Sequence, residues 1–396
     1  MAVLRELLDL AIRWTHVIAA IMWIGNSLLF NWLDRNLRPA ARPHEGSRGE
    51  AWLLHSGGFY EVEKTLAPGE TLPRPLHWFK WQAYITWLSG VALLLLVYWM
   101  NGAALLLNPG LALPAGFARF LSAALLLGGL ALYEMLWHAP TTRSSLPRIA
   151  LSVALLLAMV YPLTRAFSGR ALFLHTGALL GTIMAANVFF HIMPAQRRMV
   201  GAIEGGRPTD PRLSERAKVR SIHNNYLTFP VVALMVSSHF PGLHGHDRGV
   251  AVLALLLIAG ATIRHILNVR FDWRPWAPAL AATILLSFGA LYLVAARPFG
   301  APPAPRGASL EPVMFEQAEA IIRKRCTVCH SASPADRSFG IAPGSVMFDT
   351  PEQMRALAPR IRVRAIETTS MPPNNWTHMT NAERELLARW VYEQVP

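Results

Sequence analysis

The sequence is poor in charge for its length. Charged residues make up 15% of the 396 residues, whereas 53% are hydrophobic. This composition excludes a wholly soluble protein and is typical of a chain that lies mostly in a membrane. Cysteine is scarcer still, because the chain contains only two. No low-complexity tract occurs apart from one proline-rich stretch after residue 297.

Eight apolar segments are long enough to cross a bilayer, which takes roughly 17 to 25 helical residues. They cover residues 11–33, 79–100, 117–137, 147–164, 171–193, 222–240, 249–267 and 276–296. We therefore predict an all-α fold with a polytopic bundle of eight transmembrane helices. The first segment is predicted to be a retained helix rather than a cleaved signal peptide, because Glu6 and Asp9 precede it and it lacks a small-x-small cleavage site.

The positive charge of the chain follows the predicted loops. The formal net charge of +13 belongs to residues 1–309, because residues 310–396 carry ten basic and ten acidic side chains. With the N-terminus outside, the inner segments hold nineteen Lys and Arg residues and the outer segments hold seven. The positive-inside rule favours this orientation, and eight helices then place the C-terminus outside as well. The charge thus predicts a multi-pass membrane protein with both termini outside, and no nucleic-acid partner.

Both cysteines fall in one motif, Cys326-Thr327-Val328-Cys329-His330. Two thiols at this spacing can reach the two vinyl groups of one porphyrin, and the adjacent imidazole then lies under the iron. The motif predicts one covalent haem c, attached by Cys326 and Cys329, with His330 as an axial metal ligand. The alternative is a thioredoxin-like redox pair, which needs a βαβ context, whereas the flanking sequence has helical periodicity. The haem motif agrees with the orientation predicted from the charge, because c-type haem is attached outside the bacterial cytoplasmic membrane; the predicted location is therefore the bacterial inner membrane, with both termini on the periplasmic side.

Met371 is the predicted sixth ligand of this iron. It lies in a Ser-Met-Pro-Pro sequence after a loop that is long enough to pass around the haem edge. A thioether ligand there would raise the reduction potential. The competing candidates are Met347, Met354 and Met379, and the structural alternative is that Met371 is an ordinary core methionine.

The haem motif is predicted to lie in a separate domain. Residues 298–309 form a proline-rich linker, which favours an extended, semi-rigid spacer. Residues 1–297 are then the transmembrane domain and residues 310–396 the haem domain. Residues 311–325 have helical spacing, and Thr380-Asn381-Ala382-Glu383 is a capping box that begins a second helix. This layout resembles a small class I cytochrome c domain with two helices that cross behind the haem.

Polar residues inside the apolar segments mark candidate sites, because they are costly in a bilayer and face the bundle interior. An inner layer of them suits a planar, nitrogen-rich anion from the cytoplasm, with Arg264 as its anchor. The structural alternatives are interhelical hydrogen bonds for the His and Asn side chains, and interfacial snorkelling for Lys80 and Arg264. The layer includes His77, Lys80, Asn187, His223, Asn224, Asn225 and Arg264.

Three histidines are predicted nearer the outer face, His16, His175 and His239, and the first two form a candidate pair. One imidazole from each helix could ligate a second, non-covalent haem. The structural alternative is that both are ordinary hydrogen-bonded histidines of the bundle.

Several blocks of this sequence resemble the bacterial membrane-bound urate hydroxylase (urate oxidase) family, whose members also carry a C-terminal cytochrome c domain. The similarity covers the membrane part nearly end to end. The blocks are Arg13 to Val17, Trp23 to Gly25, His55 to Tyr60, His77 to Tyr84, Trp87 to Gly90, Gly181 to Phe190 and Ser221 to Thr228. The resemblance implies an oxidoreductase of purine degradation that converts urate to 5-hydroxyisourate and passes the electrons to haem c. It also implies a downstream respiratory electron acceptor.

Such a reaction needs a base that takes a proton from urate. His223 is the predicted base, with His77 and Asp34 as further catalytic candidates, because an imidazole accepts a proton near neutral pH. The predicted substrate-binding residues are Arg264, Asn224, Asn225, Asn187 and Lys80. Two other functions stay open: a membrane cytochrome subunit that relays electrons for a partner dehydrogenase, and a transporter with an appended cytochrome.

Overall fold

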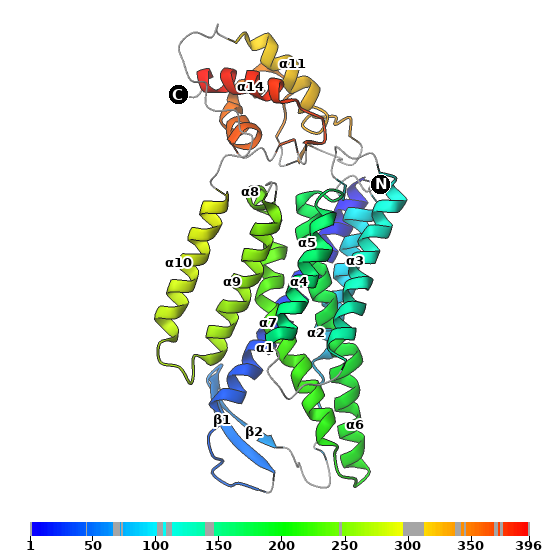
Figure 1. Cartoon of the computed structure of the whole chain (residues 1–396), viewed down its shortest axis with the longest axis vertical. Helices are drawn as coiled ribbons and strands as arrows, with labels where there is room; N and C mark the ends of the chain where they lie inside the picture. The colour runs from blue at the N-terminus through cyan, green and yellow to red at the C-terminus, as the bar shows by residue number, and fades with distance from the viewer. Residues whose placement is uncertain are drawn as a thin grey trace.

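The computed structural model describes residues 2–44, 46–65, 72, 74–100, 106–107, 113–138, 146–244, 248–295, 313–336, 342–343, 346–367, 371–372 and 375–394. The described chain is mostly helical. Figure 1 shows a bundle of long helices, with a β-hairpin at one end and the C-terminal helices beyond the other. The linker predicted at residues 298–309 lies outside the described residues.

The bundle consists of long helices, two of which continue through π-helical turns. These elements are α1 (Ala2–Asn36), α2 (Lys80–Leu93) with η1 (Leu94–Trp99), α3 (Ala115–Leu136), α4 (Leu146–Leu163), α5 (Gly169–Ala186) with η2 (Asn187–Ile192) and α6 (Met193–Glu204), α7 (Pro211–Ser237), the short α8 (Pro241–His244), α9 (Gly249–Val269) and α10 (Trp276–Ala295).

Seven of the described helices are long and apolar enough to cross a membrane, which indicates a membrane protein. The predicted count of eight is wrong by one on this measure. The segment that differs is 222–240, which belongs mainly to the C-terminal half of α7. The hydropathy of α7 is lowered by the polar residues His223, Asn224 and Asn225. These residues do not keep α7 out of the bundle, because it packs along both α5 and α9.

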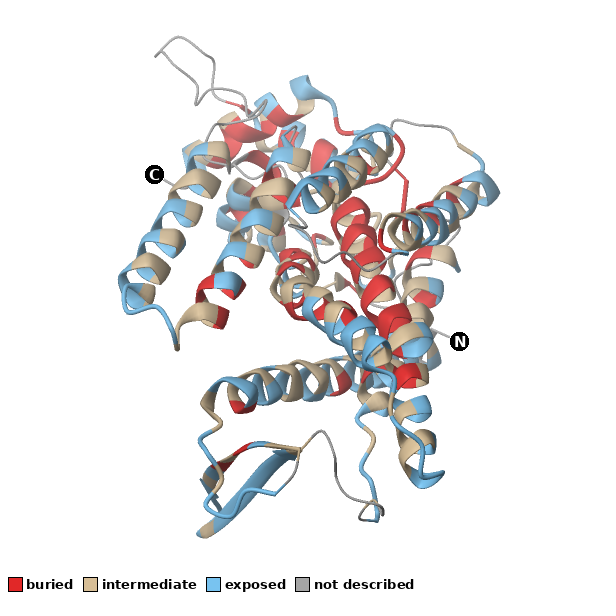
Figure 2. Cartoon of the chain, turned by 60° about the horizontal axis from the view of Figure 1, so that its bottom comes forward, coloured by how far each residue is buried: buried red, intermediate tan, exposed pale blue. Residues whose placement is uncertain are grey.

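The helix α5 forms the centre of the bundle. More than half of its membrane-length span is buried inside the protein, whereas none of the corresponding window of α10 is. Figure 2 shows the buried residues gathered on the central helices and the exposed ones around them. The helices α7 and α9 approach closely at Gly260, where a Cβ atom would lie 2.7 Å from the backbone nitrogen of Pro230. Glycine is therefore required at this crossing.

A β-hairpin corrects the all-α prediction. The strand β1 (Ser47–His55) pairs antiparallel with β2 (Gly58–Thr65), and Leu54 lies opposite Phe59. Ser56 and Gly57 join the strands with φ angles of 52° and 76°. Two consecutive positive φ angles are typical of the type I′ turn, whose twist matches that of the flanking strands. The Ser-Gly-Gly sequence is typical of such a turn. It lies in a charged connection between two membrane-length helices, and the sequence analysis therefore predicts no strands there.

The C-terminal helices build a second, smaller core. They are α11 (Phe315–Arg325), α12 (Pro351–Ala356), α13 (Ala358–Ile361), η4 (Arg362–Glu367) and α14 (Asn381–Gln394). The helices α11 and α14 pack together, and the ring centroids of Phe315 and Trp390 lie 5.7 Å apart. Trp390 and Ile322 are almost completely buried. The two predicted helices and their contact are thus confirmed.

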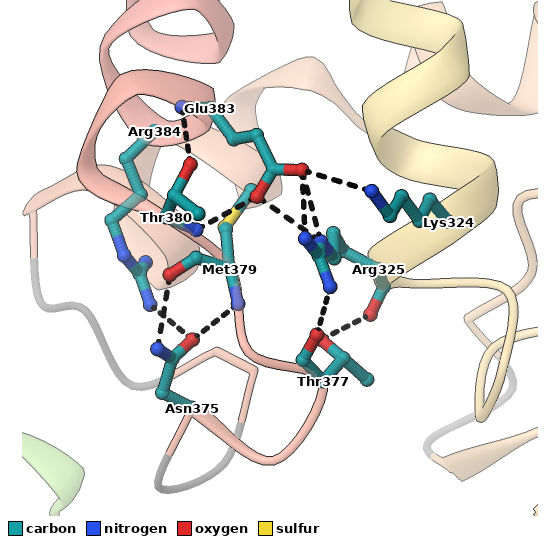
Figure 3. A network of polar contacts seen from close by, with 8 residues as sticks. All are labelled: Lys324, Arg325, Asn375, Thr377, Met379, Thr380, Glu383 and Arg384. Atoms are coloured by element: carbon teal, nitrogen blue, oxygen red, sulfur yellow. Dashed lines mark hydrogen bonds and ion pairs between the residues drawn. The ribbon is translucent and has the colours of Figure 1, made fainter. Parts of the chain in front are cut away.

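Glu383 joins these two helices (Figure 3). Arg325 Nη2 donates to Glu383 Oε1 at 2.9 Å, and the side chains of Arg325 and Glu383 are only 13% and 19% exposed. The backbone N–H of Thr380 donates to Glu383 Oε2 at 2.7 Å, while the N–H of Glu383 donates to Thr380 Oγ1 at 3.2 Å. These reciprocal bonds confirm the predicted capping box. Desolvation opposes ionisation of Glu383, but the hydrogen bonds from Arg325 and Thr380 outweigh it and hold its pKa below the usual range.

We expect Glu383→Gln to destabilise the contact between α11 and α14 by about 1 to 2 kcal/mol, because the cap and the ion pair are both weakened. Hydrogen exchange of residues 381–394, measured on the full chain, should become faster. Since the native pKa of Glu383 lies below its unfolded value, the stabilisation is complete above the unfolded pKa and is lost as pH falls through the native pKa. The exchange rates of the wild type and of Glu383→Gln should therefore become equal in acid.

The matched control is Glu319→Gln, which removes an i,i+4 ion pair with the half-exposed Arg323. Surface pairs of this kind contribute about 0.5 kcal/mol or less, so exchange of residues 381–394 should hardly change. Equal acceleration by both variants would contradict the role given to Glu383.

Candidate functional site

A cavity of ≈ 1220 Å³ lies at the hairpin end of the bundle. Its walls come from the C-terminal half of α1, the hairpin, the segment that begins α2, the η2–α6 continuation, α7 and the end of α9. These are the segments that the charge distribution predicts to lie on the inner side. The volume is ample for a small planar ligand, since ligand pockets of roughly 300 to 1000 Å³ are usual.

The cavity lining has an excess of positive charge. Asp34 is its one carboxylate among the described lining residues, and Lys64 Nζ binds Asp34 Oδ1 at 2.5 Å. The cationic lining residues are Arg35, Arg48, Lys64, Lys80 and Lys218. Of these, Arg35 is also paired, with Asp272 at 2.7 Å. A cleft lined by one sign of charge attracts ligands of the opposite sign, so the cavity is suited to an anion.

Amide and aromatic side chains complete the walls. Asn26 Nδ2 donates to Gln82 Oε1 at 2.7 Å, which fixes two lining amides relative to each other. The rings of His77 and Phe79 meet edge to face with centroids 4.6 Å apart, and Phe30 lies 5.1 Å beyond Phe79. These groups provide hydrogen bonds and an apolar surface for a planar ring.

Five of the predicted site residues line this cavity. They are Asp34, His77, Lys80, Asn224 and Asn225. Three others, Asn187, His223 and Arg264, are not among the lining residues.

Arg264 lies behind the cavity wall and is completely buried. Its Nε donates to Asn225 Oδ1 at 3.0 Å, and Asn268 Nδ2 donates to the same oxygen at 2.7 Å. The carbonyl end of Asn225 is thereby fixed, which leaves its amide N–H group as the end available to a ligand. Arg264 is therefore a positioning residue in this structure and contributes positive charge from behind the wall.

Asn187 is fully buried and held by hydrogen bonds on both ends of its amide. Its Nδ2 donates to Asn224 Oδ1 at 2.8 Å and to the Tyr133 hydroxyl at 3.0 Å, while its Oδ1 accepts from Arg220 at 3.1 Å. Interhelical bonds of this kind join helices rather than bind a substrate. Asn187 thus supports the cavity residue Asn224 from behind.

Glu134 is a residue of a partly buried network that the sequence analysis does not predict. It accepts from Arg220 Nη2 at 2.9 Å and lies 2.9 Å from His191 Nε2, so it joins α3 to α7 and to η2. Arg220 also donates to the Trp137 carbonyl at 2.9 Å. The available signal was an ionisable residue within the apolar segment 117–137, where such residues need a partner.

His223 turns toward α3 rather than toward the cavity. Its Nδ1 is hydrogen-bonded to the Tyr133 hydroxyl at 2.7 Å, and its ring centroid lies 4.2 Å from that of Trp137. A second tyrosine–histidine pair reaches the cavity instead. Tyr226 lines it, and the Tyr226 hydroxyl is hydrogen-bonded to His265 Nδ1 at 2.7 Å.

The C-terminal motif follows directly on α11. Cys326 and Cys329 are both half-buried and are not joined by a disulfide, and the His330 N–H donates to the Cys326 carbonyl at 2.9 Å. His330 Nδ1 donates to the Val346 carbonyl at 3.0 Å, which leaves Nε2 as the nitrogen that can bind iron. Among the described residues, no group of three or more His, Cys, Asp or Glu could hold a metal ion alone.

Met371 is half-buried and fixed through its backbone. Its carbonyl accepts from Arg384 Nη1 at 2.9 Å, and its N–H donates to the Arg364 carbonyl at 2.8 Å. Met354 and Met379 are buried in the core of the C-terminal helices, and Met347 is half-buried. Met371 is therefore more exposed than Met354 and Met379.

The histidines proposed for a second haem do not fit that role here. His175 is completely buried, its Nδ1 donates to the Ala171 carbonyl at 2.7 Å, and its Nε2 is hydrogen-bonded to Ser122 Oγ at 2.8 Å. Both ring nitrogens are thus occupied. His16 Nδ1 donates to the Thr86 carbonyl at 2.9 Å.

The fold and the cavity define a helical membrane protein with a polar, cationic cavity at one end of its bundle. Residues 2–295 match the family model described as Urate oxidase N-terminal, and the chain belongs to that family. No curated protein and no solved structure matches the chain. Membership indicates an oxidoreductase with a urate-related function, in agreement with the resemblance found in the sequence.

We expect Arg220→Gln to destabilise the bundle by about 3 kcal/mol, because it removes the buried arginine that pairs with the Glu134 carboxylate and leaves only His191 beside it. The measurement is the midpoint of thermal unfolding of the purified protein in detergent. The control is Arg74→Gln, which removes an exposed ion pair with Glu204 and should leave the midpoint nearly unchanged. Equal midpoints for both variants would show that the Glu134–Arg220 pair is not structural.

Proposed function

We propose that this protein oxidises urate to 5-hydroxyisourate in the cavity at the hairpin end and passes the electrons to a haem c attached at Cys326 and Cys329. The observation that carries the proposal is a net positive, amide-lined cavity inside the segment that matches the urate oxidase family. Urate is a planar anion rich in carbonyl and N–H groups, so its chemistry complements such a lining.

The reaction determines what the cavity residues have to do. The urate monoanion and one water yield 5-hydroxyisourate, one proton and two electrons. A base must therefore accept one proton. His77 is the favoured base, because it lines the cavity and an imidazole accepts a proton near neutral pH. Asp34 is bound to Lys64, and His223 lies behind the wall against Tyr133, so both are weaker candidates.

Binding of the anion is assigned to the remaining walls. Lys80 and Lys218 supply positive charge, and the amide N–H group of Asn225 is suited to a urate carbonyl. Arg264 acts on the substrate through Asn225, whose orientation it fixes. Phe30 and Phe79 provide an apolar surface beside His77.

The C-terminal domain would hold the haem through thioethers to Cys326 and Cys329, and His330 and Met371 would be the residues that bind its iron. The hydrogen bond from His330 to Val346 orients the imidazole, and Arg384 holds the Met371 backbone. A haem c bound there would supply an acceptor for one electron at a time.

The first test is oxygen-free oxidation of urate by the purified chain, followed through the absorption of reduced haem. We expect Cys326→Ala combined with Cys329→Ala to abolish covalent haem and urate-dependent haem reduction. Covalent haem that survives both substitutions would refute the attachment site. Oxidation by the intact chain only when a partner dehydrogenase is added would favour the electron-relay function, and urate transport without chemical change would favour a transporter.

The second test separates binding from proton transfer. We expect Lys80→Gln to raise KM for urate roughly tenfold, since one charge-assisted contact is lost. His77→Asn should lower kcat by roughly 10² or more with a smaller change in KM, because it removes the base. The matched control is His223→Asn, which should retain most of the wild-type kcat. A large loss of kcat in the control, with wild-type kcat in His77→Asn, would return the role of base to His223.

A further inference from the structure

The β-hairpin carries an exposed apolar tip. Trp52, Leu54, Phe59 and Tyr60 are 58%, 68%, 75% and 53% exposed, and they flank the turn at Ser56 and Gly57. Figure 2 shows the hairpin standing apart from the buried centre of the bundle, with most of its surface exposed. Large exposed apolar patches are uncommon on soluble surfaces and mark contacts with another phase or partner.

The position of the hairpin indicates that its apolar tip contacts the membrane. Arg35, next to the last residue of α1, pairs with Asp272 in the turn between α9 and α10. The hairpin therefore leaves the bundle at the level where three membrane-length helices end. The ion pair between Lys64 and Asp34 holds the end of β2 beside the end of α1, at the same depth. A segment held at this level lies at the boundary between lipid and water.

We propose that the tip of the hairpin inserts into the interfacial layer of the bilayer, with phospholipid as its partner. Trp52 and Tyr60 are amphipathic rings of the kind enriched at this layer, and Leu54 and Phe59 can enter the acyl region. The hairpin has no cationic excess, because Glu50, Glu61 and Glu63 outnumber Arg48 and Lys64. The attraction is therefore apolar and does not require anionic lipid.

This contact would also hold one wall of the cavity. Arg48 and Lys64 belong to the two strands and line the cavity. A hairpin fixed in the interface keeps both cations at the mouth of the cavity, whatever ligand the cavity takes. The inference therefore does not depend on urate as the substrate.

The test is photo-crosslinking of the full chain in vesicles of phosphatidylcholine. A benzophenone amino acid is placed at Leu54 and, as the matched control, at the exposed Arg212 near the start of α7. We expect phospholipid adducts at position 54 in several-fold higher yield than at position 212, detected by mass spectrometry. Phe59→Ser in the same protein should reduce the yield at position 54, because it weakens insertion of the tip. Hydrogen exchange of the bundle helices should stay unchanged, which separates this loss from misfolding.

Three outcomes would overturn the proposal. Equal lipid adducts at positions 54 and 212 would leave the tip in water. Adducts between two copies of the chain would make the hairpin a protein interface. Adducts that form only after anionic lipid is added would mean that headgroup charge, rather than apolar insertion, recruits the hairpin.

Discussion

The hydrogen bonds that α7 makes with its neighbours hold the site together. Arg220 binds Glu134 of α3, Asn224 Nδ2 donates to the Met184 carbonyl of α5, and Asn225 accepts from α9. In a low-dielectric interior an unpaired polar group is costly, so each of these side chains fixes α7 against one particular helix. The close approach of Gly260 to Pro230 adds a steric constraint on the same helix.

These bonds also order the cavity wall. Asn224 and Asn225 face the cavity and are held from behind by Asn187 and Arg264, while Asn268, which also lines the cavity, binds Asn225 from the side. A wall whose amides are already oriented loses little entropy when a ligand binds. The fully buried Arg264 places its charge where water does not screen it, so its influence on an anion in the cavity is stronger than that of an exposed arginine.

The sequence predicts the parts of this architecture that depend on local pattern. Apolar length identifies the spans, and the Thr380–Glu383 capping box marks the start of α14. The rotation of α7 could not be predicted, because consecutive helical residues point about 100° apart. His223, Asn224 and Asn225 therefore meet α3, α5 and α9 respectively, and the sequence gives no means of telling which of them faces the cavity. The hairpin was not predicted, because its two strands lie in a charged connection between membrane-length helices.

The arrangement of the two sites constrains how electrons can travel. The cavity lies at the hairpin end of the bundle, and the C-terminal helices lie beyond the opposite end (Figure 1). A hydrocarbon layer of roughly 30 Å separates two such ends, which is too far for one electron transfer step. A carrier at intermediate depth is therefore required if urate reacts in this cavity and haem c accepts its electrons. The pair His16 and His175 does not meet this need in the arrangement seen here, because both ring nitrogens of His175 are engaged. Residual haem absorption in the chain without Cys326 and Cys329 would identify such a carrier, and its absence would move the oxidation site toward the end of the bundle that faces the C-terminal helices.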